Sequence, residues 1–329
     1  MNTSTSYAID IDRIAQKSAQ IIAEVEKAII GKTEVLRKML AALLSSGGHI
    51  LLEDYPGLAK TLIANSFSKA LGLDFRRIQF TPDLLPGDIT GGYVFETGKN
   101  TFTLRKGPIF TNLLLADEIN RASPKTQSAL LESMQEYQVT LEGESFKLAD
   151  PFIVVATQNP IEYEGTFPLP EAQLDRFLVK LSIGYPRLDE ELEILERRKQ
   201  RMGDEVLLDK VVDKDTFLSM RRSVESIFVH PDVERYIIDL IDKTRHHSQV
   251  VIGASPRGSL ALFKLSRAWA AMEGRNYVLP DDVKLFAVPA LRHRIILEPS
   301  LWSSRTAELD IIEEILRSVP VPVITDAQQ

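Results

Sequence analysis

Two short stretches of this chain carry residues that could bind and activate a phosphate group. In the first, the apolar run Ile50 to Leu52 leads into a turn at Pro56-Gly57, and Lys60 and Thr61 follow. A strand, a loop, a Lys-Thr pair and a helix are the usual build of a phosphate-binding loop. Backbone N–H groups and the helix N-terminus attract phosphate oxygens, the lysine reaches the outer phosphates, and the hydroxyl ligates Mg²⁺.

The strict pattern G-x-x-x-x-G-K-[ST] is not met, because Asp54 replaces the first glycine and Ala59 the second. An ordinary strand, turn and helix therefore remains an alternative for this stretch alone. If it is a phosphate-binding loop, its ligand contacts are expected from Tyr55, Pro56, Gly57, Leu58, Ala59, Lys60, Thr61 and Leu62.

The second stretch, residues 112–118, is an apolar run that ends in two adjacent carboxylates, Asp117 and Glu118. The carboxyl ends of parallel strands gather at one edge of a sheet, where ligands bind. An aspartate there can hold Mg²⁺ through water, and the neighbouring glutamate can polarise a water for in-line attack on the outer phosphate. We therefore assign Asp117 and Thr61 to the metal and Glu118 to the water.

A further apolar run, residues 152–157, ends in Gln158 and Asn159. A neutral amide at this edge can hydrogen-bond the outer phosphate or the attacking water without repelling either. The alternative is that Asn159 starts an Asn-Pro turn. Because three strand ends then supply the groups that nucleotide hydrolysis needs, we favour the functional interpretation of Asn159.

The elements that must position these residues follow from the apolar pattern. Short, unalternating apolar runs separated by helical segments are typical of strands buried on both faces of a parallel sheet, and they occur at 50–52, 76–80, 107–118, 152–159 and 177–183. Two helices, at 11–30 and 33–46, precede the first strand. The sequence thus predicts a three-layer α/β domain.

From Gly184 the pattern changes to charged helices. We place a domain boundary near Tyr185-Pro186, with an α/β domain at 1–185 and a smaller all-helical domain at 186–329. Two alternating segments interrupt the first domain, one turned at residues 96–100 and one at 142–144, and both are predicted to be hairpins. They are either surface decorations or working loops that project from one face of a ring.

Composition excludes several classes of function. The chain has 329 residues and a net charge of −7, which argues against a broad nucleic-acid footprint. It has no cysteine, and its five histidines show no ligand spacing, so thiolate zinc sites and cysteine nucleophiles are excluded. No apolar run approaches the roughly 18 residues of a membrane span. The polar N-terminus does not resemble a signal peptide, so we expect a cytoplasmic protein.

The chain resembles the MoxR family of AAA+ ATPases. The resemblance is carried by five stretches taken as a set: LLEDYPGLAKT, LLLADEINRA, VVATQNP, LPEAQLDRF and GASPRGSLAL. The resemblance covers nearly the whole chain. It implies ATP and Mg²⁺ as ligands, a homo-oligomeric and commonly hexameric ring, a helical lid, and two inserted loops that correspond to the hairpins. Families of this kind act as chaperones that mature or activate a client protein complex, often beside a partner with a von Willebrand factor A domain.

The resemblance also implies roles for particular residues. Arg176 in LDRF would be an arginine finger, Arg257 in SPRG the lid arginine that senses the nucleotide, and Ile30-Gly31 would lie by the adenine. Arg176 precedes a strand, at the edge opposite the phosphate loop, so it should complete the site of a neighbouring subunit.

Simpler interpretations of the arginines stay open. Arg176 could form a surface ion pair with Asp175 or Glu171, and Arg257 could be an idle residue at a helix start. Arg121 is either a subunit contact or a surface residue.

The sequence therefore predicts an ATP-hydrolysing remodelling machine. The alternatives are a chelatase-like or nucleic-acid-remodelling motor, and a nucleotide-binding scaffold that barely turns over.

Overall fold

The fold is described from a computed structural model, which covers residues 10–98, 100–160, 165–302, 304 and 306–323. The first nine residues, on which the expectation of no signal peptide rests, lie outside this range. No helix in the described part of the chain has the length and apolar character needed to span a membrane.

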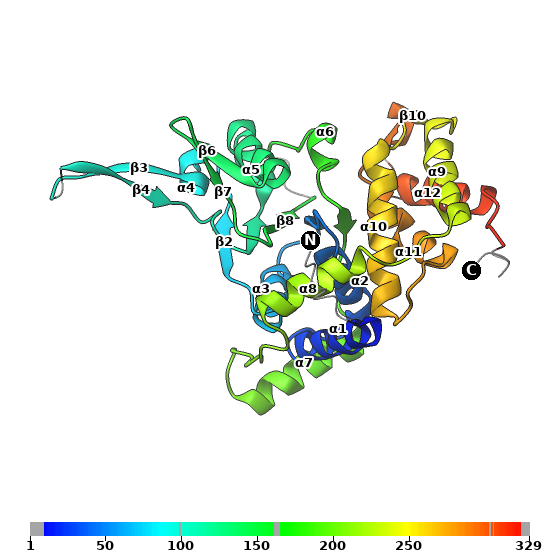
Figure 1. Ribbon diagram of the computed structural model, residues 1–329, viewed down its shortest axis with the longest axis horizontal. Helices are drawn as coiled ribbons and strands as arrows, with labels where there is room; N and C mark the ends of the chain where they lie inside the picture. Colours follow the sequence, from blue (N-terminus) through cyan, green and yellow to red (C-terminus); the bar gives the residue numbers. More distant parts are fainter. Residues whose placement is uncertain (1–9, 99, 161–164, 303, 305, 324–329) are drawn as a thin grey trace, which may run out of the picture.

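A parallel sheet of five strands organises the N-terminal half (Figure 1). Its order is β2-β5-β8-β1-β9, and the strands are β1 (Ile50–Glu53), β2 (Phe75–Gln79), β5 (Leu113–Asp117), β8 (Ile153–Gln158) and β9 (Val179–Leu181). The predicted strands are therefore confirmed, although β5 begins at Leu113 rather than near Gly107. All pairings are parallel, so every strand ends at the same edge.

Alternate residues of the strands enter two different cores, because successive side chains point to opposite faces. On β5, Leu113 and Leu115 lie in one apolar cluster, and Leu114 and Ala116 lie in the other. The first face is covered by α1 (Ile11–Glu26), α2 (Thr33–Leu44) and α3 (Lys60–Ala70), and the second by α4 (Pro86–Thr90) and α5 (Pro124–Glu136). The predicted three-layer α/β arrangement is confirmed.

Both predicted hairpins form. The first joins β3 (Gly91–Glu96) to β4 (Thr101–Lys106) and extends far from the body (Figure 1). The second joins β6 (Gln138–Leu141) to β7 (Glu144–Lys147), and its Val139 enters the second core. The Tyr93 hydroxyl donates to the Glu144 carboxylate over 3.0 Å, so the hairpins touch.

After β9 the chain is mainly helical, as predicted. The helices are α7 (Leu188–Arg201), α8 (Lys214–Val224), α9 (Pro231–Arg245), α10 (Pro256–Met272), α11 (Pro280–Leu291) and α12 (Ala307–Ser318), with the short segment η2 (Pro299–Leu301) before α12. Two further short segments, η1 (Ile119–Arg121) and α6 (Glu171–Leu174), lie before β9. The region is not entirely helical, because β10 (Val250–Ile252) and β11 (Ile296–Leu297) pair within it. The predicted change at Tyr185-Pro186 falls between β9 and α7.

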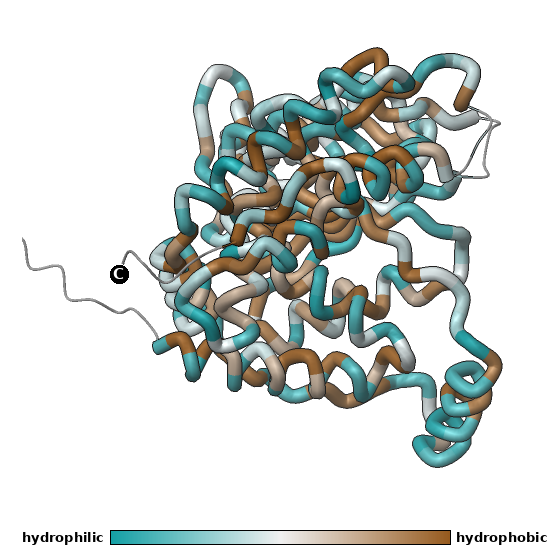
Figure 2. Tube along the Cα trace, turned by 90° about the vertical axis from the view of Figure 1, so that its right-hand side faces the viewer, coloured by the Kyte–Doolittle hydropathy of each residue, from teal (hydrophilic) through white to brown (hydrophobic). Residues whose placement is uncertain are grey.

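The helical region shares an apolar core with the sheet layer. Helix α10 packs on α1 and α2, and α11 packs on β9. Leu262 and Leu265 of α10 lie in the same cluster as Leu52 of β1. By contrast α7 lies at the periphery, lowest in Figures 1 and 2, and leaves Leu188 88% exposed. Separate domains at 1–185 and 186–329 remain a prediction.

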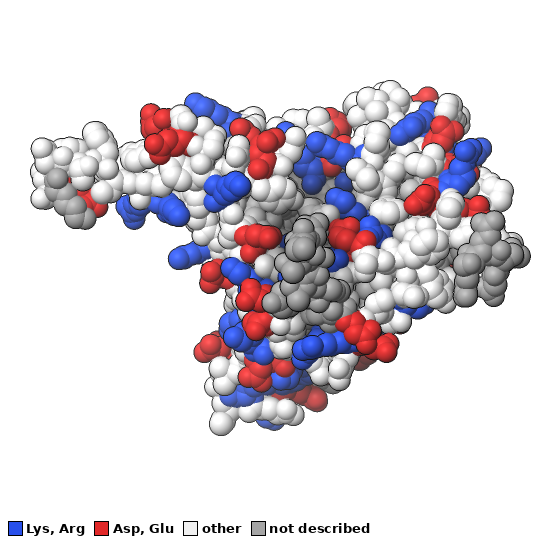
Figure 3. Space-filling view, viewed as in Figure 1, with Lys and Arg blue, Asp and Glu red and all other residues white. Residues whose placement is uncertain are grey.

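Charge is mixed on the face shown in Figure 3, where Lys and Arg alternate with Asp and Glu over most of the molecule.

The β3-β4 hairpin is predicted to be dispensable for folding, because none of its strand residues is buried. We expect Phe95→Ser together with Phe102→Ser to shift the melting temperature by no more than about two degrees. As a control, Leu114→Ala in β5 removes a fully buried side chain and should lower the free energy of unfolding by about 2–5 kcal/mol. A comparable loss in the hairpin variant, measured by urea unfolding, would show that this hairpin supports the core.

Candidate active site

The predicted phosphate loop lies between β1 and α3, and its conformation explains both departures from the strict motif. Pro56-Gly57 forms a turn in which Gly57 has φ of +82°, a region that favours glycine. Ala59 has φ of +55°, so the residue in the second glycine's place holds the left-handed conformation that glycine would supply. The backbone geometry of the loop is therefore kept, with local strain at Ala59.

Asp54 does not face the cleft. Its carboxylate accepts hydrogen bonds from the Ser182 hydroxyl at 2.8 Å and from the backbone N–H groups of Ile183 and Gly184, the latter at 3.3 Å. Asp54 thus fastens the loop to the chain that leaves β9. The Asp54 carboxylate makes these hydrogen bonds, and Asp54 does not line the cleft where phosphate would lie.

The residues predicted for phosphate and metal line one cleft of about 420 Å³, together with the loop from Pro56 to Leu62. Lys60, Thr61, Asp117, Glu118 and Asn159 are all among its walls. Asp117, Glu118 and Asn159 come from the ends of the adjacent strands β5 and β8, and Lys60 and Thr61 come from the first turn of α3, which follows β1. Tyr55, which was predicted as a ligand contact, is not among the residues that line this cleft, and its ring lies 5.8 Å from that of Tyr185.

The Lys60 side chain folds back onto the phosphate loop that precedes it. Its ammonium donates to the Asp54 carbonyl at 2.5 Å and to the Tyr55 carbonyl at 3.1 Å. A lysine held in this way closes the loop around the space above the α3 N-terminus. Helix N-termini and lysine ammonium groups both favour phosphate at such a position.

Asp117 and Glu118 are held by neighbours in the sheet. The Thr157 hydroxyl donates to Asp117 Oδ1 at 2.6 Å and accepts from the Glu118 N–H at 2.8 Å. Arg77 forms an ion pair with Asp117 Oδ2 at 2.7 Å. The Gln79 amide donates to Glu118 Oε2 at 2.7 Å. These contacts fix the direction in which both carboxylates face.

Glu118 has φ of +56°, the left-handed region, at the point where β5 ends. Strained backbone of this kind persists where surrounding contacts hold it, and it is common at functional sites. Arg121 binds the same carboxylate at 3.0 Å, so it lies beside the cleft. Asn159 is 5% exposed, and its carbonyl accepts from the Asn120 amide at 3.4 Å.

The donor set fits Mg²⁺ bound together with a nucleotide. Magnesium takes oxygen ligands, usually one or two carboxylates with waters and substrate phosphates. The cleft offers the Asp117 carboxylate and the Thr61 hydroxyl. Among the described residues no group of three or more acidic or histidine side chains could hold a metal without other ligands. The metal would therefore depend on phosphate oxygens.

The residues predicted for the adenine lie beside the start of α7. The Lys32 ammonium donates to the Tyr185 carbonyl at 2.8 Å, which brings Ile30-Gly31 close to the end of the α/β segment. Gly31 has φ of +72°, and a Cβ there would overlap the Glu190 side chain. The backbone conformation at this position favours glycine, and the Glu190 side chain of α7 occupies the space that a Cβ would fill.

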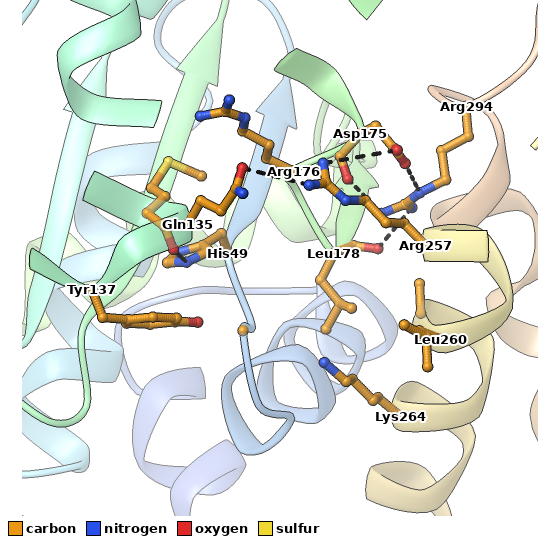
Figure 4. Close-up of a pocket in the computed structure, with 13 residues that line it drawn as sticks. His49, Gln135, Tyr137, Asp175, Arg176, Leu178, Arg257, Leu260, Lys264 and Arg294 are labelled. Atoms are coloured by element: carbon orange, nitrogen blue, oxygen red, sulfur yellow. Dashed lines mark hydrogen bonds and ion pairs between the residues drawn. The ribbon is translucent and has the colours of Figure 1, made fainter. Parts of the chain in front are cut away.

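Arg176 and Arg257 lie together, but at the opposite edge of the sheet. They line a cavity of about 260 Å³ with His49, which precedes β1, and with Asp175, which precedes β9 (Figure 4). Figure 4 shows the Arg257 guanidinium between Gln135 and Asp175, at 3.5 Å and 3.9 Å. The sequence reasoning foresaw this edge for Arg176 and left the position of Arg257 open.

Asp175 pairs with Arg294 and Ser255 and not with Arg176. Arg294 donates to its carboxylate at 2.8 Å, and the Ser255 hydroxyl does so at 2.9 Å. Arg294 is 8% exposed, and burial lowers its pKa to about 10. Among the described residues Arg176 forms no ion pair, and its Nε has no hydrogen-bond partner. The proposed surface ion pair with Asp175 is therefore absent, and the guanidinium is available to the cavity.

His49 and His293 are structural, as the sequence indicated. Burial lowers the pKa of His49 to about 4, so the ring is neutral. Its Nδ1 accepts from the Val154 N–H, which leaves Nε2 to donate to the Met134 carbonyl. Lys264 also lines this cavity, and burial lowers its pKa. The cavity thus carries more positive than negative charge.

Sequence reasoning missed three residues of these sites. Arg77 and Gln79 lie on β2, which the sequence presented only as a core strand. Their polar side chains alternate with Ile78, and this alternation was the available signal. Arg294 had no local signal, because its partner Asp175 is distant in the chain.

Comparison with known proteins agrees with this fold. Residues 49–179 match the model of the ATPase family associated with various cellular activities (AAA), and residues 242–315 match the AAA lid domain. Protein YeaC of Bacillus subtilis is 46% identical, over 97% of this chain and 98% of its own length. Chaperone MoxR1 of Mycobacterium tuberculosis is 41% identical, over 94% of this chain and 83% of its own length.

A solved structure from Cytophaga hutchinsonii, described as a presumed ATPase, superposes with a TM-score of 0.88. It is 42% identical and covers 95% of this chain and 97% of its own. A magnesium-chelatase subunit of Acidiphilium rubrum is more distant, 28% identical over 56% of the chain. The chain is therefore an AAA+ ATPase by family. Within that class it belongs to the MoxR family.

The strain at Ala59 can be tested by substitution. We expect Ala59→Gly to raise the free energy of unfolding by about 0.5–1 kcal/mol. A left-handed alanine costs about 1–2 kcal/mol, and the greater freedom of glycine in the unfolded chain returns part of this. Ala64→Gly, in the interior of α3, should instead destabilise by about 1 kcal/mol or more. Urea unfolding measures both, and destabilisation by Ala59→Gly would contradict the strained loop.

Proposed function

We propose that this protein binds and hydrolyses ATP as a ring of identical subunits, and that it acts as a chaperone-like machine on a partner protein complex. The observation that supports this most is the division of the chemistry between two edges of one sheet. Lys60, Asp117 and Glu118 lie at the carboxyl edge, and Arg176 and Arg257 lie at the amino edge. Each edge is half of a hydrolytic site, and two copies can combine them.

In the proposed site the loop N–H groups and Lys60 hold the phosphates, and Asp117 and Thr61 hold Mg²⁺. Bound Mg²⁺ would neutralise charge on the outer phosphates. Glu118, aimed by Gln79, accepts a proton from the attacking water. Asn159 orients that water or the outer phosphate. The arginines of the adjacent copy stabilise the charge that develops during transfer.

The two arginines are proposed to act across the subunit interface. A strand rises about 3.3 Å per residue, so the two edges are separated by roughly 15 Å along β1 and its flanks. This exceeds the reach of an arginine side chain. A heterologous interface that repeats around a ring would place one subunit's arginine edge on the next subunit's phosphate edge.

Two alternatives have less support. Chelatase subunits match up to 75% of the chain, but at 25–28% identity, whereas Chaperone MoxR1 is 41% identical over 94% of the chain. A binding scaffold with little turnover was motivated by the loss of two loop glycines, but Ala59 keeps the glycine conformation and Asp54 is directed away from the cleft. Cytoplasmic location and hexameric order remain parts of the proposal.

Two substitutions separate binding from chemistry. Glu118→Gln should keep the affinity for ATP and lose most turnover, because it removes only the group that activates water. Lys60→Ala should lose affinity instead. Fluorescent nucleotide binding and phosphate release measure the two properties, and Glu132→Gln on the exposed side of α5 is the matched control. Equal loss of affinity in both site variants would contradict the assigned roles.

A mixing experiment tests the shared site. Arg176→Ala subunits keep Glu118, and Glu118→Gln subunits keep Arg176, so each preparation alone should be nearly inactive. In mixed rings about one interface in four would pair an intact glutamate with an intact arginine. Because an arginine finger contributes roughly 10³ to 10⁵ in rate, partial recovery should be clear above background.

Native mass spectrometry should confirm that mixed rings form. Arg235→Ala, which alters an arginine that is 77% exposed on α9, is the control and should be fully active alone. Inactive mixed rings would show that Arg176 does not act across the interface.

The client can be sought with the same Glu118→Gln variant. Held with ATP, it should retain partners that the active protein releases. A von Willebrand factor A protein among the retained partners would support the proposed pairing, and its absence from repeated captures would argue against it.

A further inference from the structure

Arg77 on β2 brings a second fixed cation into the phosphate cleft. Its Nη2 and Nε atoms both donate to the same oxygen, Asp117 Oδ2, at 2.7 Å and 3.1 Å. The Arg77 side chain is 48% exposed, whereas that of Asp117 is 12% exposed. Arg77 therefore covers the solvent side of the carboxylate that was assigned to the metal.

The contacts of Asp117 set how a second cation can approach it. A carboxylate oxygen offers about two lone-pair directions. Arg77 takes one direction on Oδ2 through Nε and Nη2, which approach from the same side, and Oδ1 accepts from the Thr157 hydroxyl at 2.6 Å. A hydrated cation at the other direction on Oδ2 would lie beside the Arg77 guanidinium, and repulsion between the two cations favours release of Arg77.

We propose that Arg77 substitutes for the metal: it neutralises Asp117 while Mg²⁺ is absent, and it releases Asp117 when Mg²⁺ and nucleotide are bound together. The inference rests on the proposed function, because it requires that the cleft binds ATP. It assigns Arg77 as a positioning residue, which acts on the nucleotide through Asp117.

The physical basis is repulsion between like charges. Without Arg77 and without Mg²⁺, the Asp117 carboxylate would face the outer phosphates with no counter-ion beside it. Lys60 is assigned to the phosphates and its ammonium contacts the Asp54 and Tyr55 carbonyls, whereas Arg77 is a cation that contacts Asp117 itself. The guanidinium stays charged at any ordinary pH, so its neutralising effect does not depend on titration.

The cleft could then accept a nucleotide before the metal arrives. In the unmodified protein, nucleotide affinity should depend only weakly on Mg²⁺, because one cation takes the place of the other. Loss of Arg77 should make the affinity depend strongly on Mg²⁺.

The test compares binding of a fluorescent ATP analogue to the full chain in excess Mg²⁺ and in EDTA. Arg77→Gln should weaken binding in EDTA by about tenfold or more, and binding in Mg²⁺ by less than about threefold. Arg76→Gln is the matched control, since Arg76 is exposed on the opposite face of the same strand. It should leave both affinities unchanged. Thermal unfolding should confirm that each variant is folded.

A second variant separates an indirect effect from direct phosphate binding. With Asp117→Asn the repelling charge is gone, so adding Arg77→Gln should then cost little affinity in EDTA. If Arg77→Gln weakens nucleotide binding in EDTA by the same factor in the Asp117→Asn variant as in the unmodified protein, Arg77 binds phosphate itself and the proposal is wrong.

Two other outcomes would also overturn the inference. Equal loss in Mg²⁺ and EDTA would make Arg77 a general phosphate contact, and no loss in EDTA would make it a surface ion pair. These results would leave the proposed function intact. Absence of nucleotide binding by the unmodified protein in both conditions would instead refute the proposed function, and the inference with it.

Discussion

Parallel pairing of the five strands is the constraint on which the rest of this structure depends. It brings the ends of β1, β5 and β8 to one edge and the starts of β1 and β9 to the other. Groups that follow strands form the phosphate cleft, and groups that precede strands form the arginine-lined cavity. The sheet separates the two groups by more than a side chain's length, so in the proposed ring it is association of subunits that would bring them together.

Buried ionic contacts hold each half in place. Asp54 ties the phosphate loop to the segment after β9, and Arg294 ties the segment before β9 to α11 through Asp175 and several carbonyls. Removing one partner of such a pair leaves an unpaired buried charge, which commonly costs about 3–5 kcal/mol. Strand β9 is thus anchored at both ends by charged groups that belong to the two sites. A change at either end would be felt by both.

Much of this arrangement followed from the sequence. Apolar runs predicted the strands, and the rule that parallel strands end at one edge placed Lys60, Asp117 and Asn159 together. The partners of these residues could not be predicted in the same way. Arg77 reaches Asp117 only because β2 lies beside β5, and strand order is not encoded in local periodicity. The left-handed backbone of Ala59 was also hidden, since alanine rarely adopts it.

The apolar core that α10 and α11 share with α1, α2 and β9 has a mechanical consequence. Swinging these helices away would expose side chains such as Leu262 and Leu265, at about 1.5–3 kcal/mol for each. Separation of these helices from the sheet therefore carries a free-energy cost. Movements that leave this core intact, such as displacement of a whole subunit or of a projecting element, avoid that cost. The β3-β4 hairpin, none of whose strand residues is buried, is such an element.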